Sequence, residues 1–157
     1  MLVKELLLAT AMVGAIVIVH LTGLALLIRA LKSHSRLFRS LQILPLTLLV
    51  TATLGIILIH TVEIWLYAAL YMELGAFTAF EQALYFSTVT YASVGYGDML
   101  LPIEWRILGA IEGAAGIIML GWSTAFLISL LTQMKLLGHD WLTREPTVHE
   151  RKIVKGR

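Results

Sequence analysis

The chain has 157 residues, of which 59% are hydrophobic and only 14% are charged, and its net charge is +2. A single small soluble domain cannot bury so much apolar surface, so this composition excludes an ordinary soluble domain and indicates a membrane protein. The chain contains no cysteine, which excludes disulfides and metal sites built from thiolates.

The first apolar segment covers residues 5–28 and contains one charged residue, Glu5, and one histidine, His20. About 20 apolar residues cross the hydrocarbon of a bilayer, so we expect a transmembrane helix over residues 1–31. A cleaved signal peptide is disfavoured, because the apolar stretch before a possible cleavage sequence, ATA, is too short for a signal core. A basic linker over residues 32–42 follows.

The second apolar segment, residues 43–72, predicts an outer transmembrane helix over residues 43–74. Trp65, Tyr67 and Tyr71 cluster near its end, as in the aromatic belt at a membrane interface.

His60 and Glu63 lie three positions apart and therefore on one face of this helix. Ionisable side chains inside a membrane are rare and are candidates for function. Two hypotheses follow: a proton sensor or metal site, or a polar clamp that joins this helix to the next short helix through Ser87 or Thr88.

The segment between the second and third apolar runs begins with a possible capping box. Thr78 and Glu81 have the required spacing, which predicts a helix from Ala79 to about Ala92. Such a helix is about 20 Å long, too short to span a membrane. Non-helical backbone at membrane depth is stable only where it is buried in protein or lines water. We therefore expect residues 75–103 to form a re-entrant helix and a loop that lines a wet path.

The third apolar segment, residues 107–134, predicts an inner transmembrane helix over residues 104–136. Its one charged residue, Glu112, either faces a water-filled cavity or supports the packing of the short helix. Small residues of this helix form either a gating hinge or a close helix contact, and Thr124 is a candidate for lining the cavity. The small residues considered are Gly113, Gly116 and Gly121.

Lysine and arginine are concentrated in two places. Residues 29–40 carry four of them and the tail from residue 135 carries six, whereas residues 73–106 carry one, against four acidic residues. The positive-inside rule then makes the linker and the tail, residues 137–157, cytoplasmic and places the N-terminus and the re-entrant loop outside. A voltage sensor is disfavoured for residues 29–40, because these charges follow the span rather than lie inside it.

The loop itself reads SVGYGD over residues 93–98. Glycine accepts positive φ angles, so Gly95 and Gly97 allow successive carbonyl oxygens to point toward one axis, where they can replace water around a cation. Ser93 adds a hydroxyl oxygen, and Asp98 adds negative charge at the outer mouth. The C-terminal end of the preceding helix favours a cation there as well.

The stretch ALYFSTVTYASVGYGDMLLP resembles the pore loop and selectivity filter of tetrameric potassium channels. The resemblance implies that backbone carbonyls of the filter bind dehydrated K⁺, and that Tyr96 packs against the pore helix. Val89 stands where many relatives carry a glutamate, which removes a carboxylate pair with Asp98. The implied K⁺ ligands are Ser93, Val94, Gly95 and Tyr96, with Gly97 completing the filter and Tyr85, Phe86, Thr88 and Val89 supporting it.

The resemblance also implies an all-α fold with three transmembrane helices per subunit, a re-entrant pore helix before the third, and a homotetramer in the lipid of the plasma membrane. The function it implies is passive, potassium-selective conduction, without enzymatic chemistry, a cofactor other than the permeant K⁺, or a nucleic-acid partner. The short tail leaves no room for a ligand-binding domain. The alternatives are a weakly selective cation channel, a subunit of a potassium uptake transporter, and a non-conducting membrane partner. The sequence assigns neither a gating stimulus nor a role to the first helix.

Overall fold

The computed structural model describes residues 2–37 and 44–133. They form four α-helices and one short 3-10 turn, and this described part contains no strand. The elements are α1 (Leu2–Leu37), α2 (Leu44–Glu73), α3 (Phe80–Tyr91), η1 (Ile103–Trp105) and α4 (Arg106–Gln133). The all-α prediction is confirmed. The helix α1 continues six residues beyond the expected end at residue 31, and the rest of the basic linker and the tail over residues 137–157 lie outside the described residues.

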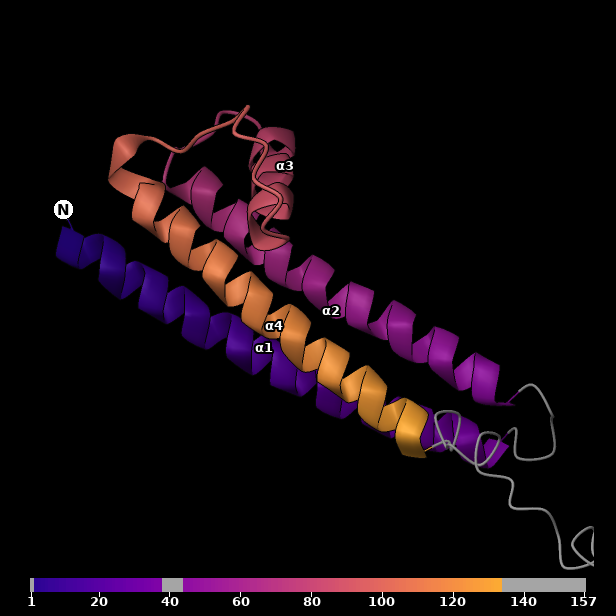
Figure 1. Cartoon of the computed structure of the whole chain (residues 1–157). Coiled ribbons are helices and arrows are strands. Elements are labelled where there is room, and N and C mark those ends of the chain that lie inside the picture. Colours follow the sequence, from indigo (N-terminus) through magenta and orange to yellow (C-terminus); the bar gives the residue numbers. More distant parts are fainter. Residues whose placement is uncertain (1, 38–43, 134–157) are drawn as a thin grey trace, which may run out of the picture.

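Three of these helices are long and apolar enough to cross a membrane. The candidate spans are Leu2–Ser33, Leu46–Glu73 and Ile103–Gln133. Figure 1 shows the three long helices side by side, with the short α3 against α2 and α4 near one end. The start of α1, the end of α2 and the start of α4 lie at this same end, and the ends of α1 and α4 lie at the opposite end.

The contact between α1 and α2 depends on two glycines, one in each helix, and each glycine faces the other helix. A Cβ atom at Gly23 of α1 would lie 2.7 Å from the Ile59 side chain of α2, and one at Gly55 of α2 would lie 2.5 Å from the Leu27 side chain of α1. Each glycine therefore receives a large side chain of the other helix, and the two backbones approach closely. Leu27 and Ile59 are buried in the same apolar cluster.

The helix α2 ends at a glycine in the left-handed conformation. Gly75 has φ of +66°, its amide donates to the Met72 carbonyl at 3.0 Å, and the next amide, of Ala76, donates to the Tyr71 carbonyl at 2.9 Å. This pair of bonds is a Schellman motif, which satisfies carbonyls at the end of the helix.

Two predictions for this end of the molecule are wrong. The capping box does not form, because α3 begins one residue later than its spacing requires: Ala79 is the N-cap, and Thr78 instead contacts the Gln82 side chain at 3.4 Å. The aromatic belt is also reduced to Trp65, which is 53% exposed, since Tyr67 and Tyr71 are fully buried among the helices.

The start of α4 is capped by a residue from α1. The buried Glu5 carboxylate accepts the backbone amides of Ile107 and Leu108 at 2.7 and 3.0 Å. A carboxylate is favourable at a helix N-terminus because the amides there lack helical partners and carry partial positive charge. Lys4 lies over the Trp105 ring at 5.9 Å, so the first turn of α1 is anchored at the start of the third span.

Candidate ion pathway and buried polar clusters

The loop after α3 has an alternating backbone. Ser93, Gly95 and Gly97 have positive φ angles of 56°, 53° and 76°, whereas the residues between them do not. The expected left-handed conformation of the two glycines is confirmed, and Ser93 adds a third such position that the sequence did not suggest. An added Cβ atom at Gly95 or Gly97 would meet nothing within 4 Å in this chain, so the backbone angle, rather than space, requires glycine.

The amides of this loop are turned back toward α3. Those of Val94 and Gly95 both donate to the Val89 carbonyl, at 2.9 and 3.2 Å, and that of Ser93 donates to Thr90 at 2.8 Å. In a trans peptide the N–H and C=O groups point in opposite directions. The carbonyls of Ser93 and Val94, which share peptides with the bonded amides of Val94 and Gly95, therefore point away from the end of α3.

Asp98 is joined to α3 by a tyrosine. The Tyr85 hydroxyl donates to Asp98 Oδ2 at 2.7 Å, and this hydrogen bond raises the pKa of the Tyr85 phenol. Tyr85 thus supplies a polar side-chain partner for Asp98. Val89 has an apolar side chain, and only its backbone carbonyl bonds to the loop.

Tyr96 lies near the pair Tyr85 and Phe86 of α3, because it lines one pocket together with them. In the single chain its side chain is still 72% exposed. Phe86 packs against Tyr71 and Phe77, each at 5.4 Å between ring centroids.

The small residues of α4 differ in what they contact. A Cβ atom at Gly116 would overlap the Tyr91 carbonyl, and one at Gly113 would lie 3.2 Å from the Thr90 carbonyl. These two glycines therefore admit the C-terminal end of α3, which supports the packing interpretation over the hinge. A Cβ atom at Gly121 would meet no atom of the described chain within 4 Å.

Two threonines predicted as site residues are exposed and bond to their own helices. Thr88 donates to the Leu84 carbonyl at 2.7 Å, and Thr124 donates to the Leu120 carbonyl at 2.9 Å. Neither of these hydrogen bonds joins two helices.

Glu112 lies between three helices. It is fully buried, and its carboxyl group contacts the hydroxyl of Tyr71 in α2 and that of Ser87 in α3, both at 2.5 Å. Ser87 also contacts the Ile64 carbonyl at 3.0 Å. Of the two interpretations of Glu112, the structure supports the packing role, since the carboxyl group faces α2 and α3.

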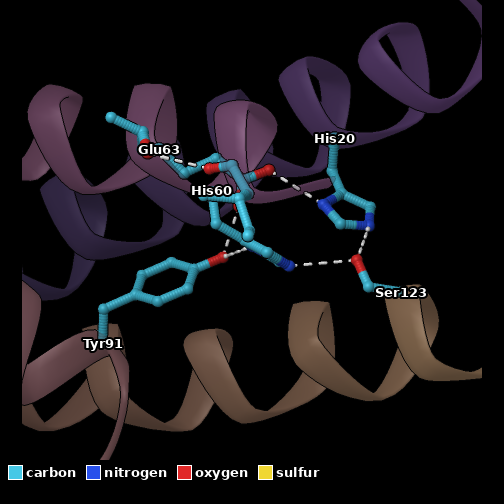
Figure 2. A network of polar contacts seen from close by, with 7 residues as sticks. His20, His60, Glu63, Tyr91 and Ser123 are labelled. Atoms are coloured by element: carbon cyan, nitrogen blue, oxygen red, sulfur yellow. Dashed lines mark hydrogen bonds and ion pairs between the residues drawn. The ribbon is translucent and has the colours of Figure 1, made fainter. Parts of the chain in front are cut away.

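Glu63 forms a second buried cluster (Figure 2). Its two carboxylate oxygens contact His20 Nδ1 at 2.9 Å and His60 Nδ1 at 3.1 Å, and the Tyr91 hydroxyl donates to the oxygen that faces His60. The remaining ring nitrogens of both histidines face Ser123 Oγ, at 3.0 Å from His60 Nε2 and 3.5 Å from His20 Nε2.

This cluster extends the hypothesis of a polar clamp. The partners of His60 and Glu63 come from all four α-helices, but they are Tyr91 and Ser123 rather than the expected Ser87 or Thr88. The predicted site residues did not include His20. Its signal was present, because it is an ionisable residue in the middle of an apolar span, and such residues usually find a polar partner.

A family model described as ion channel matches residues 48–133, which is more than half of the chain. The matched region covers most of α2 together with α3, the loop of residues 92–102 and α4, and it leaves α1 outside. No curated protein and no solved structure shows significant similarity to the chain. With three apolar helices of spanning length, the protein is a multi-pass membrane protein. The match over the pore region confirms the resemblance at the level of the family: the chain belongs to this family of ion channels.

Proposed function

We propose that the protein is a potassium-selective channel that conducts K⁺ passively through the loop of residues 93–98. The observation that carries this proposal is the alternating backbone of Ser93, Gly95 and Gly97, with the neighbouring amides bonded to Val89. Carbonyl oxygens that point away from α3 can replace the hydration shell of a cation. In this proposal the carbonyls of Ser93, Val94, Gly95 and Tyr96 bind K⁺, and Asp98 attracts cations at the outer mouth.

The pore requires several copies of the chain. One loop covers one side of an ion, and a ring of carbonyls around an axis needs loops from neighbouring subunits. Val94 and Tyr96 are 51% and 72% exposed in the single chain, which fits a loop that is completed by assembly. We therefore propose a homotetramer in which α4 lines the pore, α3 is re-entrant and α1 lies at the periphery.

The proposed membrane orientation follows the basic residues. The start of α1 and the filter loop lie at one end of the bundle. The ends of α1 and α4, which the basic residues accompany in the sequence, lie at the other. Placing the basic end in the cytoplasm of a cell with this protein in its plasma membrane satisfies the positive-inside rule. Asp98 then faces the outside.

The test compares K⁺ and Na⁺ flux in liposomes that contain the purified full chain, with Gly95→Ala as the decisive variant. We expect K⁺ flux to exceed Na⁺ flux many-fold, and Gly95→Ala to abolish it, because alanine resists the φ of +53°. Gly75→Ala is the matched control: its φ is +66° and it also has nothing within 4 Å, but it lies in the turn after α2. This control should keep selective flux.

The other outcomes distinguish the alternatives. Equal K⁺ and Na⁺ flux from the wild type would indicate a weakly selective cation channel. An intact tetramer without flux would indicate a non-conducting partner. Loss of flux in both glycine variants, with loss of the tetramer, would mean that backbone strain acts on folding rather than on the filter.

A further inference from the structure

We propose that His20, His60 and Glu63 form a transition-metal site, best suited to Zn²⁺, that fastens α1 to the pore-forming helices. This site lies outside the filter loop, and the inference does not depend on which ion the channel selects. His20 is the only one of the three ligands that comes from α1, since His60 and Glu63 both lie in α2.

The first argument is geometric. The potential ligand atoms of the three side chains all lie within 4.8 Å of one another, and all three residues are buried. Zinc binds imidazole nitrogen and carboxylate oxygen at about 2.0–2.2 Å, so adjacent ligand atoms of a tetrahedral site lie about 3.4 Å apart. The two nitrogen–oxygen separations here are 2.9 and 3.1 Å. These two contacts go to different oxygens of Glu63, so an ion would lie between the two rings and the carboxylate once the three side chains adjust toward it.

The second argument is a count of protons. An ionised carboxylate only accepts hydrogen bonds, so Nδ1 of both His20 and His60 must carry a proton to bond Glu63. A neutral imidazole has one N–H group, which leaves both Nε2 atoms as acceptors. Both Nε2 atoms face the hydroxyl of Ser123, which has a single proton to donate. With both imidazoles neutral, these contacts to Glu63 and Ser123 are thus one proton short, and either an added proton on one ring or a metal ion between the rings and Glu63 fills the shortage.

A divalent cation removes this shortage. When the ion replaces the protons between Glu63 and the two Nδ1 atoms, each Nε2 carries a proton, and the Ser123 oxygen can accept from both rings. Histidine ligands of metals characteristically donate their second nitrogen to such a partner, which orients the ring. Tyr91 would likewise continue to donate to Glu63.

The third argument concerns charge. In the described part of the chain, the basic side chains within ion-pair distance of the fully buried Glu63 are His20 and His60 alone, and an imidazole is charged only when it is protonated. With both imidazoles neutral, as counted above, Glu63 is a buried carboxylate without a cation, which is costly inside a membrane. A divalent ion supplies that charge, and imidazole with carboxylate is a ligand set that Zn²⁺ accepts.

The experiment measures metal directly. The detergent-solubilised full chain is stripped with a chelator, reloaded with Zn²⁺, desalted and analysed for metal content, and Co²⁺ is used in a parallel sample for its visible absorption. We expect a single tightly held ion per chain in the wild type. Ser123→Ala should weaken binding about 10–100-fold, as expected for the loss of a partner to the ligands. His20→Gln and Glu63→Gln should weaken it further, and Zn²⁺ should raise the melting temperature of the wild type but not theirs.

Glu112→Gln is the matched control, because Glu112 is equally buried and contacts Tyr71 and Ser87 but no histidine. It should retain the metal. If one of the ligand variants does not fold, Ser123→Ala and the Co²⁺ spectrum of the wild type still decide. Metal that remains bound in His20→Gln and Glu63→Gln would overturn the proposal, because it would lie elsewhere. A folded wild type that retains no metal would also overturn the proposal. It would mean that an additional proton on one imidazole, and not a metal ion, completes the contacts of the cluster.

Discussion

Glu63 and Glu112 are both fully buried carboxyl groups on neighbouring membrane helices, but their partners differ in chemistry. Glu63 is held by two imidazoles and a phenol, whereas Glu112 is held by two hydroxyls. A hydroxyl both donates and accepts, so it can hydrogen-bond a carboxyl group whether or not that group carries a proton. An imidazole can in addition change its charge or bind a metal. Burial alone therefore does not distinguish a structural carboxyl group from a candidate functional one, but its partners do.

The largest expected loss of stability comes from truncating each of the two carboxyl groups to alanine, and the two losses should differ. Glu63→Ala leaves His20 Nδ1 without its acceptor, and of His60 Nδ1 and the Tyr91 hydroxyl, which lie 3.1 Å apart, only one can donate to the other. Two donors are therefore stranded, and because each buried unsatisfied donor costs about 1–3 kcal/mol, the free energy of unfolding should fall by about 2 kcal/mol or more. Glu112→Ala should cost less, because Ser87 retains the Ile64 carbonyl and only Tyr71 loses its acceptor. Chemical denaturation in detergent measures both. Equal losses would contradict the idea that the number of stranded partners sets the cost.

A pair of tyrosine variants should reverse this order. Tyr71→Phe leaves Ser87 as the one remaining side-chain partner of Glu112, and we expect a loss of about 1–3 kcal/mol. Tyr91→Phe should lose about 0.5–1.5 kcal/mol, since Glu63 keeps both histidines. Both variants remove one hydroxyl and leave the ring, so the difference reports the hydrogen bonds. A greater loss for Tyr91→Phe in the same denaturation measurement would show that Glu63 depends on the phenol.

The smallest expected effect concerns a third buried carboxylate, Glu5, whose partners are backbone amides. Glu5→Gln keeps an acceptor oxygen for Ile107 and Leu108 but removes the charge at the start of α4, which should cost about 0.3–1 kcal/mol. Glu5→Ala removes the cap as well and should cost about 1 kcal/mol more. Melting temperatures of both variants test this order. An identical loss in the two would mean that the charge alone, and not the hydrogen bonds, anchors α1.

Local patterns predicted the parts of the fold that depend on neighbouring residues. The hydropathy of three segments predicted three long helices, and the spacing of Gly95 and Gly97 predicted their positive φ angles, because both properties depend on the chain within a few positions. The capping box is a local prediction that is wrong. Its residues have the right spacing, but α3 begins after Ala79, one residue beyond the register that Thr78 requires.

The contacts of the buried polar residues could not be predicted in the same way. His60 and Glu63 were recognised as candidates from their position in an apolar helix, yet His20 is 43 positions from Glu63, and Ser123 is 63 from His60. Glu5 looked like an ordinary charge near the beginning of a span, but it caps a helix more than 100 positions away. Nothing in the sequence near these residues identifies their partners.

The sequence by itself determined that the protein is an all-α membrane protein with a glycine-rich loop of alternating backbone before its third long helix, because apolar length and glycine spacing are properties of short stretches of chain. Only the tertiary structure decided which of the buried polar groups meet. Inside a membrane each such group needs a partner, and helix packing rather than sequence distance brings the partners together. The contacts of α1 were decided in this way: through Glu5 and His20 it reaches the start of α4 and the Glu63 cluster, and so packs against the matched channel region that it precedes.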